Sequence, residues 1–361
     1  MSAAPRALET GPGALRALSL GRWSVLLDPR SVLVCLLLAT ALAIAIVAAV
    51  LAGEHPMPIA ALARVLSGTA TPAEDLIIGQ LRAPRVLTGA VVGLALGLAG
   101  ALFQSVTRNP LGSPDVIGFD TGAATGALVA MLFTGGGVRT TALGAVAGGA
   151  GTAVAVLLLA SGRGQAARHG PDALRLVLVG LGIGLGLAAL NSLLVVGSNI
   201  YDAQSAAVWL IGNLAGRDWS RLALLAPVVA VGLVLALLLS RRLSVAELGD
   251  DGAAALGLQP GPLRLAAVAV GVLLASSAVA TAGPIGFVAL TAPQVARRLT
   301  RADGPGLPAA GLTGALVLVL ADLAAREAFV PREVAVGVLT GGVGGLYLIW
   351  LLGREWRKGH A

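Results

Sequence analysis

The chain has 361 residues, of which 57% are hydrophobic and only 12% are charged. Soluble domains carry about 25% charged residues, so this composition indicates an integral membrane protein. Lys358 is the only lysine, and a Walker-type nucleotide site needs a lysine directly after a Gly-rich loop. One cysteine and three histidines, none at ligand spacing, exclude a disulfide framework and a Cys/His metal centre. The chain is therefore expected to bind no nucleotide, metal or other cofactor by itself.

Ten apolar stretches, taken in chain order, are predicted to cross a bilayer as helices, because a crossing needs about 20 apolar residues. They are residues 32–52, 86–106, 116–134, 139–160, 173–197, 221–240, 263–283, 285–300, 307–325 and 334–352. The eighth is short and follows a Gly-Pro pair, so spans seven and eight are expected to form a tight hairpin. Nine or eleven spans are the alternatives. The predicted fold class is an all-α integral membrane protein with ten transmembrane helices.

The basic residues indicate how these spans are oriented. With the N-terminus in the cytoplasm, most basic residues lie in cytoplasmic segments, in agreement with the positive-inside rule. Eight arginines lie outside: Arg64, Arg82, Arg85, Arg139, Arg217, Arg221, Arg326 and Arg332. The chain thus divides into a cytoplasmic segment 1–30, a transmembrane domain 31–353 and a cytoplasmic tail 354–361. Its net charge of +7 is better explained by topology than by nucleic-acid binding.

The external stretch 53–84 contains an amphipathic segment at residues 58–66. Ile59, Leu62 and Leu66 fall on one helical face there, which favours a short helix lying in the membrane interface.

The cytoplasmic loop 241–262 is predicted to hold two short helices. Ser244 and Glu247 match an S-x-x-E capping box, and Asp250 or Asp251 is placed to cap a second helix that Gly257 ends. The second helix presents small and apolar side chains that suit docking into a groove on a partner. These side chains are Ala254, Ala255 and Leu256. The alternative is an ordinary amphipathic connector that lies on the membrane.

Five segments within residues 30–353 resemble the signatures of one protein family, in the family's order. They are QLRAPRVL at 80–87, NPLGSPDVIGF at 109–119, the Leu-Gly pairs at 248–249 and 256–257, AGPIGFVALTAP at 282–293 and VLADLAAR at 319–326. The corresponding family signatures are RLPR, NPLA-P–G, a Leu-Gly…Leu-Gly loop, AGPIGFVGL-PH and LLAD–AR. The chain therefore resembles the iron-siderophore/cobalamin family of ABC importer permeases.

Three shorter segments, at 112–119, 249–251 and 344–349, are most similar to the ferric-enterobactin-type permeases of that family. The chain also departs from the family pattern at three positions. Gln294 stands where the family usually has His, Ala83 replaces Leu within RLPR, and Ala335 replaces a Pro before the last span. Any role tied to the family His is thereby put in doubt.

The resemblance implies a type II ABC importer permease fold in the bacterial cytoplasmic (inner) membrane, with both termini in the cytoplasm. The implied partners are a second permease subunit (a paralogue in a heterodimer rather than a second copy), two cytoplasmic ATPase subunits that hold ATP and Mg, and an extracytoplasmic siderophore-binding protein. The residues implied to couple to the ATPases are Ser244, Glu247, Leu248, Gly249, Asp250, Asp251, Ala254, Ala255, Leu256, Gly257 and Leu258. The arginines implied to dock acidic residues of the binding protein are Arg82, Arg85 and Arg326.

Polar residues within or near the spans suggest two further sites. Asp322 is a functional candidate because an ionisable group in a membrane is costly, but the favoured interpretation is a partner for Arg326 one helical turn on. The candidate translocation path near the outer end of span five consists of Asn191, Ser192, Ser198 and Asn199. Helix–helix hydrogen bonding or simple loop exposure is the alternative for this group.

The predicted function is a permease subunit that moves a ferric siderophore, catecholate and enterobactin-like, into the cytoplasm by ATP-driven alternating access. A cobalamin or haem importer of the same architecture is the alternative. A secondary ion-coupled transporter would need buried ionisable residues, and Asp322 is nearly alone. An intramembrane enzyme is disfavoured because no span contains His, and neither G-x-S-x-G nor H-E-x-x-H occurs.

Overall fold

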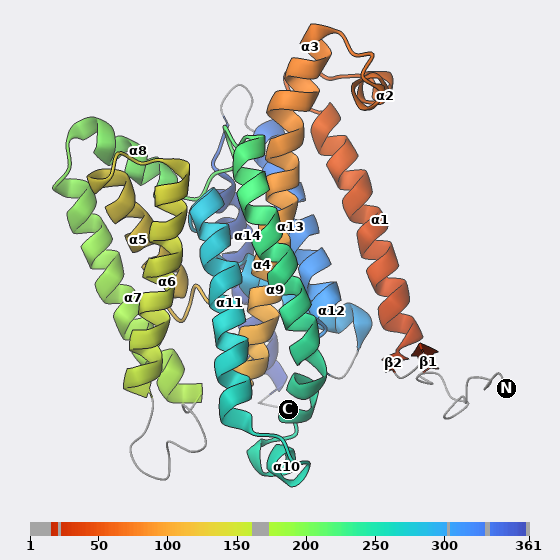
Figure 1. Cartoon of the computed structure of the whole chain (residues 1–361), viewed down its shortest axis with the longest axis vertical. Coiled ribbons are helices and arrows are strands. Elements are labelled where there is room, and N and C mark those ends of the chain that lie inside the picture. Colours follow the sequence, from red (N-terminus) through yellow and green to blue (C-terminus); the bar gives the residue numbers. More distant parts are fainter. Residues whose placement is uncertain (1–15, 21–22, 161–172, 302–303, 329–332, 359–361) are drawn as a thin grey trace.

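The computed structural model describes residues 16–20, 23–160, 173–301, 304–328 and 333–358. In this part of the chain a short antiparallel ribbon of β1 (Arg16–Leu20) and β2 (Trp23–Leu27) precedes a bundle of helices (Figure 1). The helices are α1 (Pro29–Leu51), α2 (Ile59–Ser67), α3 (Pro72–Glu74), the π-helix η1 (Asp75–Arg82), α4 (Ala83–Thr107), α5 (Phe119–Phe133), α6 (Val138–Ala160), α7 (Ala173–Val196), α8 (Ile200–Leu210), α9 (Trp219–Ala246), α10 (Asp250–Ala255), α11 (Pro260–Ala282), α12 (Val288–Thr300), α13 (Leu307–Glu327) and α14 (Val336–Lys358).

Each of the ten predicted spans coincides with a helix, and the all-α fold class is confirmed. Seven helical segments of the described chain are long and apolar enough to cross a membrane. Helix α5 and residues 336–350 of α14 are apolar but shorter, and α12 has only 13 residues. The count of ten transmembrane helices therefore stays a prediction. The amphipathic segment at 58–66 forms α2, as predicted.

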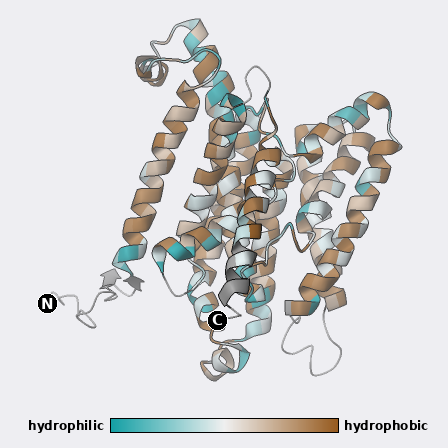
Figure 2. Cartoon of the chain, turned by 180° about the vertical axis from the view of Figure 1, so that it is seen from behind, coloured by the Kyte–Doolittle hydropathy of each residue, from teal (hydrophilic) through white to brown (hydrophobic). Residues whose placement is uncertain are grey.

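Helix α4 lies at the centre of the bundle, between α13, α11, α9 and α12. The most hydrophobic stretch of the segment that contains it is 83% buried, whereas the corresponding stretches of α1 and α7 are each only 17% buried. The exposed surfaces of these outer helices are largely apolar (Figure 2), as lipid contact requires. The segment α5–α8 forms a separate group on one side of the bundle, and α1 lies on the opposite side (Figure 1).

Glycines bring α4 and α13 into backbone contact. A Cβ atom added at Gly93 would lie 2.3 Å from the carbonyl oxygen of Gly314, and one at Gly97 would lie 2.3 Å from that of Ala310. In a membrane, helices associate through this kind of close packing, since lipid is as apolar as the side chains. Helix α4, about 37 Å long at 1.5 Å per residue, is thus fixed against its neighbour along its middle turns.

The predicted capping box in the loop 241–262 is wrong. Helix α9 continues to Ala246, and the Ser244 hydroxyl donates to the carbonyl of Ser240 one turn back instead of capping a new helix. The second helix, α10, forms where it was predicted, but Gly249 precedes it and no side chain caps it. Asp250 and Asp251 lie in its first turn, where their charge favours the positive end of the helix dipole.

Candidate functional site

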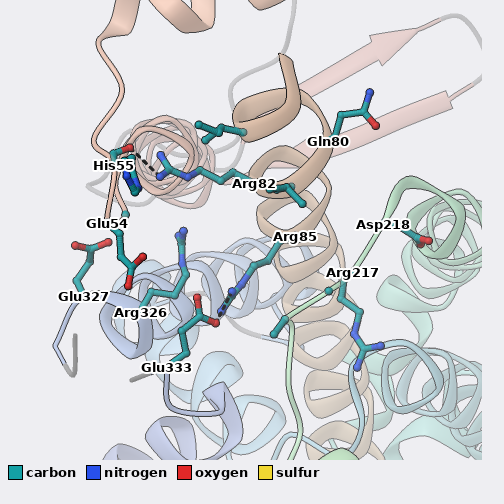
Figure 3. Close-up of a pocket in the computed structure, with 15 residues that line it drawn as sticks. Glu54, His55, Gln80, Arg82, Arg85, Arg217, Asp218, Arg326, Glu327 and Glu333 are labelled. Atoms are coloured by element: carbon teal, nitrogen blue, oxygen red, sulfur yellow. Dashed lines mark hydrogen bonds and ion pairs between the residues drawn. The ribbon is translucent and has the colours of Figure 1, made fainter. Parts of the chain in front are cut away.

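The structure brings the three predicted docking arginines into one cavity at the end of the bundle opposite α10 (Figures 1 and 3). The cavity measures about 530 Å³ and is lined by η1, the first turn of α4, the end of α13 and three loops. Arg217, from the loop between α8 and α9, is a fourth arginine of this lining. The carboxylates of the lining are those of Glu54, Asp218, Glu327 and Glu333. Among the described residues of this lining, four arginines face four carboxylates.

Arg85 forms the most extensive ion pairs of the cavity. Its Nε lies 3.2 Å from both carboxylate oxygens of Asp322, and its Nη2 lies 2.9 Å from Asp322 Oδ1. Its third nitrogen, Nη1, donates to Glu333 at 2.9 Å, a contact that is drawn in Figure 3. The Arg85 side chain is 11% exposed and that of Asp322 only 3%. Most of this guanidinium is therefore engaged inside the protein.

Asp322 also pairs with Arg326, as predicted from their spacing. Arg326 Nε lies 3.3 Å from Asp322 Oδ2, and its Nη2 donates to the carbonyl of Ala49 at the end of α1. One buried carboxylate thus serves two buried guanidinium groups from α4 and α13. A buried charge needs such partners, since removal of one side of the pair leaves an uncompensated charge.

Arg82 is bound differently, through backbone carbonyls alone. Its Nη1 lies 3.3 and 3.1 Å from the carbonyl oxygens of Val50 and Leu51, and its Nη2 lies 2.9 Å from that of His55. Val50 and Leu51 are the last two residues of α1, and their carbonyl groups have no donor within the helix. They lie at the negative end of the helix dipole. Arg82 forms no ion pair within the described residues, so its charge is available to an outside anion.

Arg217 was not singled out by the sequence, where it is one of eight outside arginines with no distinguishing motif. Its Nε and Nη2 both donate to the carbonyl of Asn213, at 3.2 and 3.0 Å. Burial, reinforced by the charge of Arg221, lowers the pKa of Arg217 to about 10, so it stays protonated at neutral pH. Figure 3 shows its side chain pointing away from the other three arginines.

The opposite end of the bundle carries α10, which protrudes below the other helices (Figure 1). The side chains predicted to dock a partner are exposed in and beside α10, and their docking role stays a prediction. Ala254 and Ala255 are exposed, Leu248 is 70% exposed and Leu256 is 66% exposed. Gly249 and Gly257 flank the helix with φ angles of +104° and +79°, values that favour glycine. Asp251 is exposed, and Ser244, Leu258 and Glu247 are half-buried.

Two carboxylates, Asp250 in α10 and Glu247 at the end of α9, connect this end of the bundle to α4, α11 and α12. Asp250 pairs with Arg108 at the end of α4 and with Arg264 of α11, the latter at 2.7 Å. Burial would raise the pKa of Asp250, but the hydrogen bonds and charges of these two arginines outweigh it and hold the pKa below its usual range. Glu247 accepts a hydrogen bond of 2.6 Å from Ser105 of α4 and lies 3.6 Å from Arg297 of α12.

The four candidate path residues are not brought together as one lining. Ser198 and Asn199 line a second cavity of about 380 Å³ between α5 and α7, which Asn191 and Ser192 do not reach. Asn199 caps α8, Ser192 and Ser198 donate to carbonyls of their own turns, and Asn191 is buried. Their role in translocation stays a prediction.

Gln294, the departure from the family His, is buried and joins three segments. Its Nε2 donates to the carbonyl of Pro110, which follows α4, at 2.8 Å. Its Oε1 lies 3.2 Å from the hydroxyl of Tyr347 on α14. The amide therefore bonds in both directions, which a side chain with one donor and one acceptor can do.

The described chain is thus a bundle with seven helices long and apolar enough to cross a membrane, a charged cavity at one end and a short, tethered helix at the other. Its fold is that of a permease of the metal-chelate type ABC transporters. The chain belongs to the FecCD transport family, whose sequence profile matches residues 41–354. It is therefore the permease subunit of an ABC importer in the inner membrane, and it is not itself an enzyme, since separate subunits hydrolyse ATP.

The relatives and one solved structure agree with this assignment. The chain is 41% identical to the ferric enterobactin transport system permease protein FepG of Escherichia coli (strain K12), over 91% of this chain and 98% of FepG. It is 37% identical to the Fe(3+)-citrate import system permease protein YfmE of Bacillus subtilis (strain 168), over 79% of this chain and 84% of YfmE. A metal-chelate type ABC transporter in an inward-facing conformation has a TM-score of 0.76 and 28% identity, and the match covers 89% of this chain and 99% of that one.

Proposed function

We propose that this permease moves a ferric catecholate siderophore of the enterobactin type into the cytoplasm. The observation that carries the proposal is the 41% identity to FepG over nearly the whole of both chains. A ferric-citrate chelate is the second candidate, because relatives named for it reach 37% identity. A cobalamin or haem importer would share the architecture but has less support from the relatives.

A test of the substrate is uptake of radioactive iron in a strain that lacks its own siderophore permeases and produces this one with its partner subunits. Ferric enterobactin should be taken up, while ferric citrate, a ferric hydroxamate, haem and labelled cobalamin should not. Uptake of ferric citrate alone would replace the catecholate by the second candidate. Uptake that persists in vesicles without any ATPase subunit would contradict an ATP-driven mechanism.

At the cavity, Arg82, Arg85 and Arg326 are proposed to receive acidic side chains of an extracytoplasmic siderophore-binding protein. The fixed forked guanidinium suits carboxylates, and Arg82 supports the proposal because its charge has no ion pair in the described chain. Exposed pairs are individually weak, so such a set orients and steers docking more than it adds affinity. Charge reversal at Arg82 alone, which leaves the buried pair of Arg85 and Asp322 intact, should weaken association with the binding protein and reduce its dependence on salt.

At the other end, α10 is proposed to sit in a groove of an ATPase subunit. The exposed Leu248 and Leu256 would supply the apolar contact, and the ties of Asp250 and Glu247 to α4, α11 and α12 would pass the movement on. Replacement of Leu256 and Gly257 should separate ATP hydrolysis from transport. Intact coupling in that variant would contradict this role for α10.

The assembly is proposed to contain a paralogous second permease subunit and two ATPase subunits, with both termini of this chain in the cytoplasm. The start of α1 and α10 lie at the same end of the bundle, opposite the cavity (Figure 1), which supports this orientation. Purification of the intact complex and its mass would distinguish a heterodimer from a homodimer. Labelling of single cysteines beside α10 and beside η1 in intact cells would test the orientation.

A further inference from the structure

The guanidinium of Arg85 is shared by two carboxylates that differ in their surroundings. Nε and Nη2 face Asp322, whose side chain is 3% exposed, through contacts of 2.9 to 3.2 Å. Nη1 faces Glu333, whose side chain is 54% exposed, through a single contact of 2.9 Å. The first carboxylate is part of the packed interior, and the second is an exposed residue of the cavity lining (Figure 3).

This difference makes Glu333 the exchangeable partner. A single ion pair with one half-exposed partner is weak, because water solvates the freed carboxylate and side-chain entropy opposes the pairing. Asp322 has no such alternative, since a buried carboxylate that loses its partners is left uncompensated. Of the two bonds that hold Arg85, only the outward one is therefore free to change while the permease stays folded.

The charge of the cavity also requires an exchange when an anion arrives. Among the described residues, four arginines of the lining face the carboxylates of Glu54, Asp218, Glu327 and Glu333, and the buried Asp322 adds a further negative charge beside Arg85 and Arg326. An incoming carboxylate therefore meets little net positive charge unless one of these groups moves away. Glu333 is the carboxylate of this lining that forms an ion pair with a predicted docking arginine in the described chain.

We propose that Glu333 is an internal stand-in for the docking partner. It occupies the outward nitrogen of Arg85 in the free permease, and an acidic side chain of the binding protein replaces it there while Glu333 turns into solvent. This inference rests on the proposed docking role of Arg82, Arg85 and Arg326. One Arg–carboxylate bond is broken for each one made, so Glu333 lowers the affinity of docking and speeds the release of the binding protein.

The test uses the complete transporter in lipid nanodiscs and, as the probe, the binding protein encoded together with this permease. Association and dissociation rates are measured for the wild type, Glu333→Gln, Glu333→Ala and the control Glu327→Gln. Glu327 lines the same cavity and is exposed, but it forms no ion pair within the described chain. Both Glu333 variants should bind about 1.4- to 5-fold more tightly, mainly through slower dissociation, and more tightly than the control.

A second background keeps the inference separate from the docking proposal. Arg85→Lys retains a charge toward Asp322 but loses the forked outward nitrogen, so Glu333→Gln should have no further effect in it. If Arg82→Gln weakens binding while the Glu333 variants equal Glu327→Gln, docking stands and the stand-in role is wrong. If Glu333→Ala binds more weakly than the wild type, Glu333 positions Arg85 for docking and the inference is overturned. If Arg82→Gln and 1 M salt both leave binding unchanged, the docking proposal itself fails.

Discussion

The two ends of α4 carry arginine–carboxylate clusters that differ in burial. At the cavity, the side chains of Arg85 and Asp322 are 11% and 3% exposed, and their contact is bidentate. At the α10 end, the side chains of Arg108 and Asp250 are 35% and 27% exposed. Arg264, the second partner of Asp250, is 13% exposed. The buried cavity cluster is costly to break, at about 3–5 kcal/mol, whereas the pair of Asp250 with the more exposed Arg108 contributes about 0.2–1 kcal/mol. The cavity end is therefore built as a fixed support, and the α10 end as an adjustable joint.

The largest effect is expected when the fixed end loses its shared carboxylate. Asp322→Asn leaves Arg85 and Arg326 buried without their common counter-ion, so the free energy of unfolding should fall by about 3–5 kcal/mol. Thermal unfolding of the purified permease in detergent measures this. Glu54→Gln, an exposed carboxylate-to-amide change at the same cavity, is the control and should stay within about 0.5 kcal/mol of the wild type. Equal stability of the two variants would show that the buried cluster at the cavity is not costly to break.

A smaller loss is expected when the middle of α4 is forced away from α13. Gly97→Ala places a Cβ atom 2.3 Å from the Ala310 carbonyl oxygen, so the backbones must separate and stability should fall by about 1–3 kcal/mol. At Gly182 an added Cβ atom meets no other atom within 4 Å, so Gly182→Ala is the matched control. The same thermal measurement applies. A Gly97→Ala protein as stable as the control would contradict the close backbone packing of α4 on α13, which fixes the middle of α4 between its two ends.

A substitution at the α10 end should change the coupling of transport to ATP hydrolysis more than the stability of the permease. Asp250→Asn removes the charge shared by Arg108 and Arg264, and we expect the transport per ATP hydrolysed to fall about 1.4- to 5-fold with little change in unfolding. Reconstituted vesicles give both rates, and Asp75→Asn, an exposed residue at the other end of the bundle, is the control. A loss of stability as large as that of Asp322→Asn would remove the distinction between the ends.

The pH dependence of this joint follows from the lowered pKa of Asp250. A carboxyl whose folded pKa is below its ordinary value of 3.8 stabilises the folded state above that value and loses the contribution as the pH falls through the lower one. The difference in coupling between the wild type and Asp250→Asn should therefore be constant from pH 5 to pH 8. A change within that range would mean that another group titrates at the joint.

The smallest expected effect is that of salt on the two ends. An increase from 0.1 to 1 M NaCl shortens the Debye length from about 10 to about 3 Å, which screens exposed pairs far more than buried ones. The transport per ATP hydrolysed by the wild type should therefore fall modestly at high salt. The loss of unfolding temperature caused by Asp322→Asn should change little. Equal salt sensitivity of both measurements would contradict the difference in burial.

The sequence predicts the parts of this molecule that depend on local spacing. The ten apolar helices, α2 and α10 follow from periodicity and hydrophobic length, and the pair of Asp322 and Arg326 follows from its separation of four residues. The pair of Arg85 and Asp322 joins positions 237 residues apart, so it depends on how α4 packs against α13. Arg217 enters the cavity for the same reason, through a loop fixed by the packing of other helices.

A local sequence pattern gave a wrong prediction where contacts between distant residues determined the structure. The Ser244 and Glu247 pattern is that of a helix start, but α9 ends only at Ala246, within this pattern. Ser244 bonds within α9, and Glu247, directly after the helix, accepts from Ser105. The partner of the Glu247 carboxylate is set by this tertiary contact, and the S-x-x-E spacing gives no information about Ser105.

The bridge of Gln294 has a consequence for proton balance. An imidazole in its place would change charge near pH 6.5, whereas an amide carries no titrating proton in the physiological range. The junction of the Pro110 turn, α12 and α14 therefore keeps one hydrogen-bonding pattern when the pH at this end of the bundle changes. Gln294 therefore makes the hydrogen bonds of this junction independent of pH.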